Sequence, residues 1–380
     1  MKKIILIIVV CLVTLLSGCK DFTTNEIYNK TYDVEVEIDN IGDSFVPAVE
    51  RATESTLGVG VYIRSSMNAS WNIESVGSCV VYETTAVLKD GTKKTYEESK
   101  TLDNVDYYEY KAVTNAHVVE VSGYFKKYTV YIGDLDRIIE AEVLGIDADI
   151  DLAVVTFKDS TLITPIEIAD SDNIKKGQIV LAVGNPNGYE YYSSASMGIV
   201  SFPKRYLEEN GYDVEYIQHD AAINPGSSGG SLVNINGELI GINTSKVVED
   251  DIDSIGFAIP SNTVLKVIER LENKQVLRKQ VGGMVSVSVS TLKNDTLFID
   301  DRVSNNDVYE LEYGVYVHSI NSKSLLYGDI KSGDVILAIN GKELRFVQEL
   351  NYLLLLSENG DQVEFLVYRD GKNVNIIGEL

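Results

Sequence analysis

The chain has 380 residues, enough for about two or three domains, and with 44% hydrophobic residues it can bury a sizeable core. Its 57 acidic and 33 basic residues give a formal net charge of −24, which argues against nucleic acid as a main partner because phosphate binding needs a surplus of lysine and arginine. The three cysteines, at positions 11, 19 and 79, cannot form a disulfide framework, and no Cys/His cluster has the spacing of a zinc site.

The N-terminus is typical of an exported protein. Two lysines precede the apolar run 4–16, which is too short for a comfortable membrane span and indicates a secretory signal, with an uncleaved anchor as the alternative. The next residues, Leu16-Ser17-Gly18-Cys19, resemble the lipobox of bacterial lipoproteins. We therefore expect a signal peptide over 1–18, lipidation at Cys19, and a membrane tether over 19–50.

Short apolar runs broken by Gly, Asn and Asp begin at about residue 57 and predict strands. These runs are 57–63, 77–82, 111–114, 128–132, 141–146, 152–157, 178–183, 198–201, 232–233, 239–242 and 256–259. So many short strands in about 200 residues suit two small β-barrels. A short helix is expected within 43–56. The charged, Tyr-rich segment 83–110 interrupts the series and is expected to be a long surface insertion, with a hairpin as one form it could take.

The hydrophobic period changes after the last of these strands. Residues 261–274 predict a helix that closes the β domain, with Ser261 as its cap. Its apolar face comprises Val264, Leu265, Val267, Ile268 and Leu271. The β domain would thus span 51–274 and a second module 280–380. For that module we expect strands near 314–320, 334–339, 362–368 and 373–377, and a helix near 346–357.

The segment 220–232 has the composition of a loop around a nucleophilic serine. A serine hydroxyl needs a base to take its proton and backbone N–H groups aimed at the developing oxyanion. Turning two N–H groups toward one point favours glycine, and Ser228 is flanked by glycines. Gly226 and Ser228 would supply the oxyanion hole. The alternative is an ordinary Gly/Ser-rich hairpin turn.

Two further residues fit the roles of base and orienting carboxylate. His117 follows a β-rich run, and Asp151 stands just before the apolar strand 152–157. Taken singly, His117 is equally a structural histidine and Asp151 a turn residue, with Asp149 as a competitor. Together with Ser228 they occur in the order His, Asp, Ser, which is the order of the chymotrypsin-type β-barrel proteases.

The combined motifs resemble the HtrA (DegP-like) family of trypsin-like serine proteases. Residues 114–119, TNAHVV, are similar to its histidine motif, and 151–154, DLAV, to its aspartate motif. Residues 220–230, DAAINPGSSGG, are similar to its serine motif, as are GELIGINT at 237–244 and IGFAIP at 255–260 to the strands that follow. The resemblance implies a mainly β fold, a trypsin-like double β-barrel of six-stranded barrels, followed by a C-terminal PDZ domain.

The family resemblance also implies a function: an ATP-independent serine endopeptidase that degrades unfolded or damaged extracytoplasmic proteins, with no metal and no cofactor. Ile223 would line the substrate pocket. The alternative is a latent or regulatory protease, a chaperone-like PDZ scaffold. Members commonly form homotrimers through N-terminal aromatic residues, for which Tyr62, Trp71 and Tyr82 are candidates. Such a lipoprotein would lie at the extracytoplasmic face of a bacterial membrane.

The second module resembles a PDZ domain in residues 330–341 and 363–371, the latter ending in the turn Arg369-Asp370-Gly371. PDZ domains bind peptide C-termini, holding the carboxylate in a backbone nest. The expected carboxylate loop is Val281, Gly282, Gly283 and Met284, with a Gly-rich linker as the alternative. The chain departs from the family pattern at Cys79, His219, Ser227 and Lys246.

Overall fold

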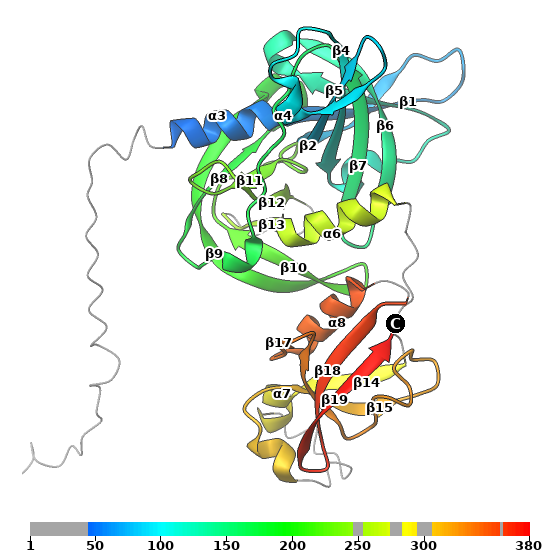
Figure 1. The fold of residues 1–380 in the computed structure, drawn as a ribbon, viewed down its shortest axis with the longest axis vertical. Helices are drawn as coiled ribbons and strands as arrows, with labels where there is room; N and C mark the ends of the chain where they lie inside the picture. The colour runs from blue at the N-terminus through cyan, green and yellow to red at the C-terminus, as the bar shows by residue number, and fades with distance from the viewer. Residues whose placement is uncertain (1–44, 246–253, 274–282, 295–305, 358–359) are drawn as a thin grey trace, which may run out of the picture. The chain divides into compact units, whose positions relative to one another are not determined.

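A computed structural model describes residues 45–245, 254–273, 283–294, 306–357 and 360–380, and Ser44–Leu380 form one compact unit (Figure 1). The predicted signal peptide, Cys19 and most of the tether lie outside the described residues, as do Lys246, Val281 and Gly282. Within the described ranges, no helix is long and apolar enough to cross a membrane.

The N-terminal part of the unit is a pair of β-barrels, which confirms the predicted fold class. The first is built from strands in the order β1-β5-β6-β7-β4-β2, and a β1–β2 pairing closes it. Its strands are β1 (Thr56–Arg64), β2 (Asn72–Leu88), β4 (Val105–Thr114), β5 (Phe125–Ile132), β6 (Arg137–Asp147) and β7 (Leu152–Asp159). The predicted helix within 43–56 is α3 (Val46–Ser55).

The second barrel closes in the order β10-β13-β12-β11-β8-β9. Its strands are β8 (Ile179–Gly184), β9 (Ser194–Glu209), β10 (Tyr212–His219), β11 (Ser231–Val233), β12 (Leu239–Thr244) and β13 (Gly256–Pro260). Strand β10 was not among the predicted strands. Its apolar residues alternate with charged ones instead of forming a run, and its Glu215 is buried because the Tyr206 hydroxyl donates a hydrogen bond to it.

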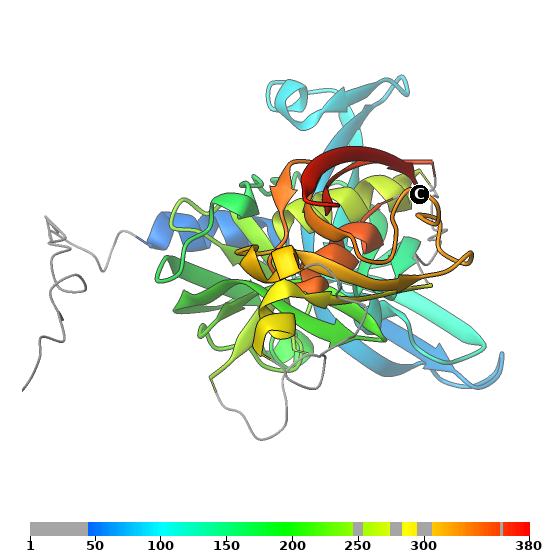
Figure 2. The same cartoon turned by 90° about the horizontal axis from the view of Figure 1, so that it is seen from below.

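The segment 83–110 forms a hairpin, the form considered for it, but less of it is an insertion than predicted. β2 continues to Leu88 and β4 begins at Val105, so the two ends of the segment pair as a hairpin, for example Thr84 with Tyr110. Only the tip, with β3 (Lys93–Thr95) and the short α4 (Tyr96–Ser99), is an insertion beyond the barrel. In Figure 2 this tip projects from the barrel as the cyan segment at the top.

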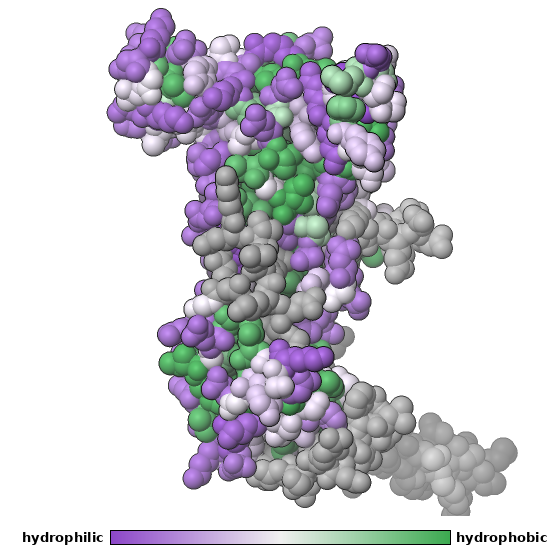
Figure 3. All heavy atoms as spheres, turned by 90° about the vertical axis from the view of Figure 1, so that its right-hand side faces the viewer, coloured by the Kyte–Doolittle hydropathy of each residue, from purple (hydrophilic) through white to green (hydrophobic). Residues whose placement is uncertain are grey.

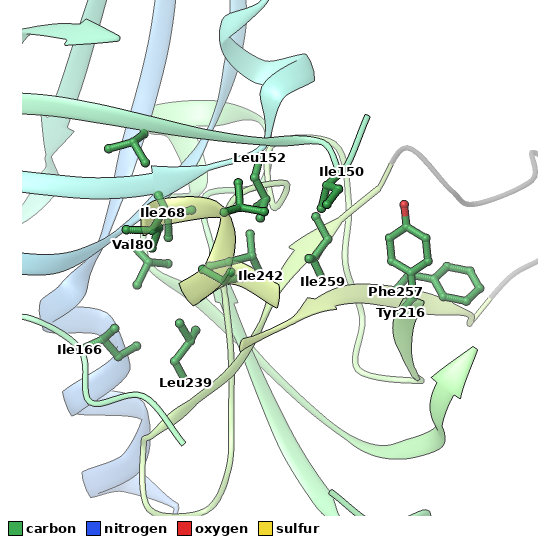
Figure 4. Close-up of a cluster of buried hydrophobic side chains, with 14 of the residues drawn as sticks. Val80, Ile150, Leu152, Ile166, Tyr216, Leu239, Ile242, Phe257, Ile259 and Ile268 are labelled. Atoms are coloured by element: carbon green, nitrogen blue, oxygen red, sulfur yellow. The ribbon is translucent and has the colours of Figure 1, made fainter. Parts of the chain in front are cut away.

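Buried apolar side chains form separate cores inside each barrel and a third cluster between them. Figure 4 shows this third cluster, in which Leu152, Ile242 and Ile259 meet Ile268 of α6 (Ser261–Glu272). Leu265 is 45% exposed, so its assignment to the apolar face of the helix was wrong. Ser261 is the first residue of α6 and not its cap, because its hydroxyl donates to the Ala169 carbonyl.

Cys79 lies on β2 within the core of the first barrel and is fully buried. It is a free thiol, and burial raises its pKa to about 12 because the thiolate would lose its hydration. In the described part of the chain it is therefore a packing residue, as a buried lone cysteine generally is.

The C-terminal module is a six-stranded sheet with two cores, one on each face. Its elements are β14 (Met284–Ser288), α7 (Val289–Asn294), β15 (Val315–Ile320), β16 (Val335–Ile339), β17 (Lys342–Glu343), α8 (Val347–Leu355), β18 (Gln362–Arg369) and β19 (Lys372–Glu379). The predicted turn at Asp370-Gly371 is confirmed, with both residues at positive φ. β14 and α7 were missed by the sequence analysis.

Helix α8 also contributes to the cluster between the barrels. Tyr352, Leu355 and Leu356 belong to that cluster, and the Tyr352 hydroxyl is hydrogen-bonded to the hydroxyl of Thr263 on α6. Asn351 Nδ2 donates to Asp213 at 2.8 Å. On the face drawn in Figure 3, an apolar area in the upper half is bordered by hydrophilic residues.

Candidate active site

His117 lies on α5 (Ala116–Val119), a single turn directly after β4. Its backbone N–H donates to Asp151 Oδ1 at 2.9 Å, and its ring Nδ1 lies 2.8 Å from Asp151 Oδ2. The Asp151 side chain is 3% exposed and that of His117 is 30% exposed. A buried carboxylate thus fixes both the main chain and the ring of a histidine whose other nitrogen remains accessible.

Asp151 is itself held from several sides. It adopts a positive φ of 61°, a conformation that the surrounding contacts must stabilise in a non-glycine residue. Asn115 Nδ2 donates to its backbone carbonyl at 2.9 Å, and Thr244 Oγ1 at the end of β12 donates to Oδ2 at 3.3 Å. Asp151 Oδ1 and Oδ2 lie 3.0 and 2.8 Å from His117 Nδ1, so Asp151 is the carboxylate that orients the ring.

Ser228 lies in a turn whose conformation requires glycine at positions 226 and 229. Gly229 has a φ of +84°, and a Cβ there would lie 2.0 Å from the Ser78 carbonyl oxygen. Gly226 has a φ of +98°, and a Cβ there would lie 2.5 Å from the Asn185 carbonyl oxygen. Side chains would collide with the main chain at both positions, which explains why the serine is flanked in this way.

The peptide groups next to Gly226 are pinned by the loop after β8. Asn187 N–H donates to the Pro225 carbonyl at 2.9 Å, and Ser78 Oγ donates to the Gly226 carbonyl at 2.8 Å. In a trans peptide the N–H points opposite to the preceding carbonyl, so the Gly226 N–H points away from Asn187. Within the described ranges, neither the Gly226 nor the Ser228 N–H donates a hydrogen bond to another group, which is what an unoccupied oxyanion hole requires.

The Ser228 hydroxyl has a partner other than His117. Its Oγ lies 2.7 Å from Ser245 Oγ and accepts the Ser245 N–H at 3.1 Å. Among the described residues, no hydrogen bond joins Ser228 Oγ to the His117 ring. The structure therefore brings His117 and Asp151 together and places the serine turn beside them, with the nucleophile turned toward Ser245.

A pocket of about 570 Å³ lies beside the serine turn. Ile223 lines it together with Pro225, Ser227 and Asn243, and the opposite wall comes from β8, β9 and the loop between them. His117 and Ser228 are not among its described lining residues. Ile223, the predicted pocket residue, thus lines a cavity that adjoins the serine turn.

Of the predicted carboxylate loop, Gly283 and Met284 are described. Gly283 has a φ of +83° and accepts the Asn321 N–H on its carbonyl at 2.8 Å, and Met284 begins β14. β14 is an edge strand, paired only with β15. The Val347 N–H at the start of α8 donates to Ser288 Oγ at the other end of β14. An edge strand beside a helix is the arrangement that can accept an added strand.

Four polar residues of this site were not singled out by the sequence analysis: Ser78, Asn185, Thr244 and Ser245. Ser78 Oγ accepts the Asn185 N–H and donates to Gly226, so it joins the loop after β8 to the serine turn. Each acts through a side chain distant in sequence from the residue it holds. The only available signal was their position next to the recognised motifs.

Comparisons with known proteins agree with this geometry. Residues 104–242 match the family described as "Trypsin-like peptidase domain", and residues 273–377 match the PDZ domain family. The HtrA-type protease AlgW, solved with a tripeptide, superposes with a TM-score of 0.60 at 27% identity, over 88% of this chain and 96% of that one. The serine endoprotease from Yersinia pestis superposes with a TM-score of 0.53 at 26% identity, over 90% and 98%. The fold and site thus define a trypsin-like peptidase domain followed by a PDZ domain.

Curated relatives narrow the class. "Serine protease Do-like HtrA" of Lactobacillus helveticus is 35% identical over 271 residues, 70% of this chain and 63% of the relative. "Periplasmic serine endoprotease DegP" of Escherichia coli (strain K12) is 37% identical over 273 residues, 70% of this chain and 54% of the relative. The chain belongs to the HtrA family. It spans between about half and two thirds of the length of these relatives.

Proposed function

We propose that the chain is an ATP-independent serine endopeptidase that acts through His117, Asp151 and Ser228. The observation that carries the proposal is the buried Asp151 carboxylate on His117 Nδ1, next to a serine turn in which the Gly226 and Ser228 N–H groups have no acceptor among the described residues. A hydrolase without the acyl-enzyme step would have no use for an oxyanion hole centred on a serine.

The geometry supports the following sequence of steps. Ser228 Oγ turns from Ser245 toward His117, attacks the peptide carbonyl, and gives its proton to His117 Nε2. Asp151 stabilises the resulting imidazolium while the N–H groups of Gly226 and Ser228 hold the oxyanion. His117 then protonates the leaving amine, and water attacks the acyl-enzyme by the same route. Thr244 contributes by donating a hydrogen bond to Asp151 Oδ2, the oxygen that lies nearest to His117 Nδ1.

Unfolded or damaged extracytoplasmic proteins are the proposed substrates, with Ile223 in the pocket that receives a substrate side chain. Val281, Gly282, Gly283 and Met284 are the proposed carboxylate loop of the PDZ domain, and a peptide C-terminus would add a strand to β14. AlgW was solved with a decapeptide and a tripeptide, which supports peptide binding in this family.

We place the protein at the extracytoplasmic face of a bacterial membrane, anchored by lipid on Cys19, with domain bounds at 1–18, 19–50, 51–274 and 280–380. Relatives named periplasmic support the location. Replacing Cys19 with Ala should move the protein from the membrane fraction to the soluble fraction. Retention at the membrane would favour an uncleaved anchor instead.

A homotrimer is proposed on the same family grounds. Of the three candidate aromatic residues, Trp71 is 37% exposed and stacks under Arg64, whereas the Tyr82 hydroxyl is already bonded to Glu272. Tyr62 and Tyr82 are half-buried, so Trp71 is the most exposed of the three candidates for contact with a neighbouring copy. Sedimentation equilibrium of the Cys19-substituted protein should give three chain masses, and a single chain mass would contradict the proposal.

The direct test is degradation of an unfolded protein. Reduced casein should be cleaved by the wild-type chain and left intact by Ser228→Ala, while both bind the same C-terminal peptides. Cleavage by both variants would mean a contaminating protease or another nucleophile.

The second candidate is a latent or regulatory protease, a chaperone-like PDZ scaffold. The bonding of Ser228 to Ser245 rather than His117 favours it, because a serine in that position is not activated. If casein is cleaved only after a C-terminal peptide is added, the latent protease is the correct description.

A further inference from the structure

We propose that Ser245 is a positioning residue that holds the Ser228 hydroxyl in a resting orientation, and that this contact must break before Ser228 can give its proton to His117. The inference deepens the proposed serine endopeptidase function and rests on it. It assigns a role to a residue outside the predicted triad, at the point where β12 ends.

The two contacts leave Ser228 Oγ unable to act. A hydroxyl has one proton to donate and two lone pairs. Ser245 N–H occupies one lone pair at 3.1 Å, and Ser245 Oγ lies 2.7 Å away, within the usual range for two hydroxyls. If Ser228 donates to Ser245, its proton points away from the histidine; if Ser245 donates, both lone pairs of the nucleophile are taken.

The frame around these contacts is rigid. Gly229 N–H donates to the Asn243 carbonyl and Asn243 N–H to the Gly230 carbonyl, both at 2.9 Å, so the serine turn is tied to β12 two residues before Ser245. Thr244, between them, holds Asp151. Residues 243–245 at the end of β12 thus contact both the Asp151 side and the Ser228 side of the proposed triad, and rotation of the Ser228 side chain would break its contact with Ser245.

A small reagent that reacts with the Ser228 hydroxyl alone can test the contact between Ser228 and Ser245. Diisopropyl fluorophosphate forms a bond between Ser228 Oγ and phosphorus; the P–F bond breaks, fluoride leaves, and His117 takes the serine proton. The reagent does not need the PDZ domain or an extended substrate. Its second-order labelling rate on the full chain in detergent, followed by intact mass, therefore reports how readily Ser228 becomes available.

Ser245→Ala removes the side-chain half of the contact and keeps the N–H. We expect labelling about 3- to 10-fold faster than wild type, the factor that one net hydrogen bond represents. Ser245→Thr retains a hydroxyl and should label at the wild-type rate. Ser245→Gly serves as a second variant without a hydroxyl and should match Ser245→Ala. Thermal unfolding midpoints check that all variants are folded, and Ser228→Ala should not be labelled.

The outcomes separate this inference from the function on which it rests. If Ser245→Ala and Ser245→Gly are labelled no faster than wild type, the role of Ser245 is overturned and the proposed peptidase function stands. Fast labelling of Ser245→Thr also overturns it, because the hydroxyl would then be irrelevant. If no variant is labelled and casein is not cleaved, the proposed function fails and the inference fails with it.

Discussion

Individual residues set the chemistry of this site through backbone geometry as much as through side chains. The N–H of Gly226 is available because the peptide that carries it is held by the Asn187 N–H at the Pro225 carbonyl, the next peptide is held by the Ser78 hydroxyl at the Gly226 carbonyl, and φ is +98°. Any other residue at 226 would have to move the main chain of Asn185. The donor and the nucleophile are thus positioned by the same strained turn.

Gly226→Ala should therefore lower kcat by about 100- to 1000-fold, the cost of losing one oxyanion donor, and should also lower the unfolding midpoint because the new Cβ would collide with the Asn185 carbonyl oxygen. Steady-state cleavage of a fluorogenic peptide measures the loss. Gly91→Ala is the matched control, because Gly91 also has a positive φ, 83°, but lies in an exposed turn with no atom near its missing Cβ. A similar loss of activity in both variants would contradict the oxyanion role.

The second residue-scale prediction concerns His219, which is fully buried and faces Gly256. Burial lowers its pKa from 6.5 to about 4 because the imidazolium would lose its hydration. Between these values the unfolded chain binds more protons than the native state, so stability falls as pH drops from 6.5 toward 4 and is unaffected above 6.5.

His219→Gln should remove this pH dependence, which is at most about 3 kcal/mol. Urea unfolding at pH 7 and at pH 4.5 gives the difference for each protein. We expect wild type to lose more stability than the variant over this interval. If both lose the same amount, His219 is not the group responsible.

At the scale of elements, the loop between β8 and β9 is fastened to the first barrel by aromatic rings. Within it, η4 (Gly188–Tyr191) carries Tyr189, whose ring centroid lies 4.3 Å from that of Tyr131, and Tyr192 meets the same ring edge-on at 5.4 Å. A Cβ on Gly60 would lie 2.6 Å from the Tyr189 hydroxyl. The first barrel thereby holds the loop whose Asn187 fixes the serine turn of the second.

Tyr189→Ala should loosen this loop and lower kcat about 10- to 100-fold, since small displacements of a catalytic group have costs of this size. Tyr189→Phe keeps the ring and should retain most activity. Tyr124→Ala, at a residue that is 97% exposed, is the control for loss of a tyrosine. Normal peptide hydrolysis by Tyr189→Ala would show that the serine turn does not depend on the ring contacts.

The elements also show what the sequence could predict. Strands that are continuous apolar runs, such as β1, β7 and β12, were predicted to within a few residues, because burial on both sides leaves an unbroken pattern. β10 was missed because Glu215 interrupts its pattern, and its burial depends on Tyr206 of the neighbouring strand. Likewise, the orientation of Ser228 depends on Ser245, 17 residues away, which no local motif specifies.

Across the whole described unit, three side chains of the PDZ domain, those of Tyr352, Leu355 and Leu356, take part in the packing of the peptidase domain. Tyr352 is 2% exposed, its ring centroid lies 5.9 Å from that of Tyr206, and it contacts Thr263 of α6. Removing such a ring costs about 3 kcal/mol or more, because the cavity does not collapse completely. The sequence predicted both domains but not this contact, since it forms between residues far apart in the chain.

Tyr352→Ala should accordingly separate the thermal unfolding of the two domains, turning one calorimetric transition into two and lowering the first midpoint. Tyr327→Ala is the matched control, because Tyr327 is in the same domain and 57% exposed. A single unshifted transition in Tyr352→Ala would mean that the contact contributes little to stability.

The burial of Cys79 has a consequence for how the protein responds to an oxidising environment. Thiol–disulfide exchange requires a thiolate, and with a pKa of about 12 and no exposed surface Cys79 presents almost none. The native protein should not form mixed disulfides or cross-link to another copy through this residue. Alkylation of Cys79 would then occur only when the first barrel opens, so the alkylation rate would measure how often that barrel unfolds.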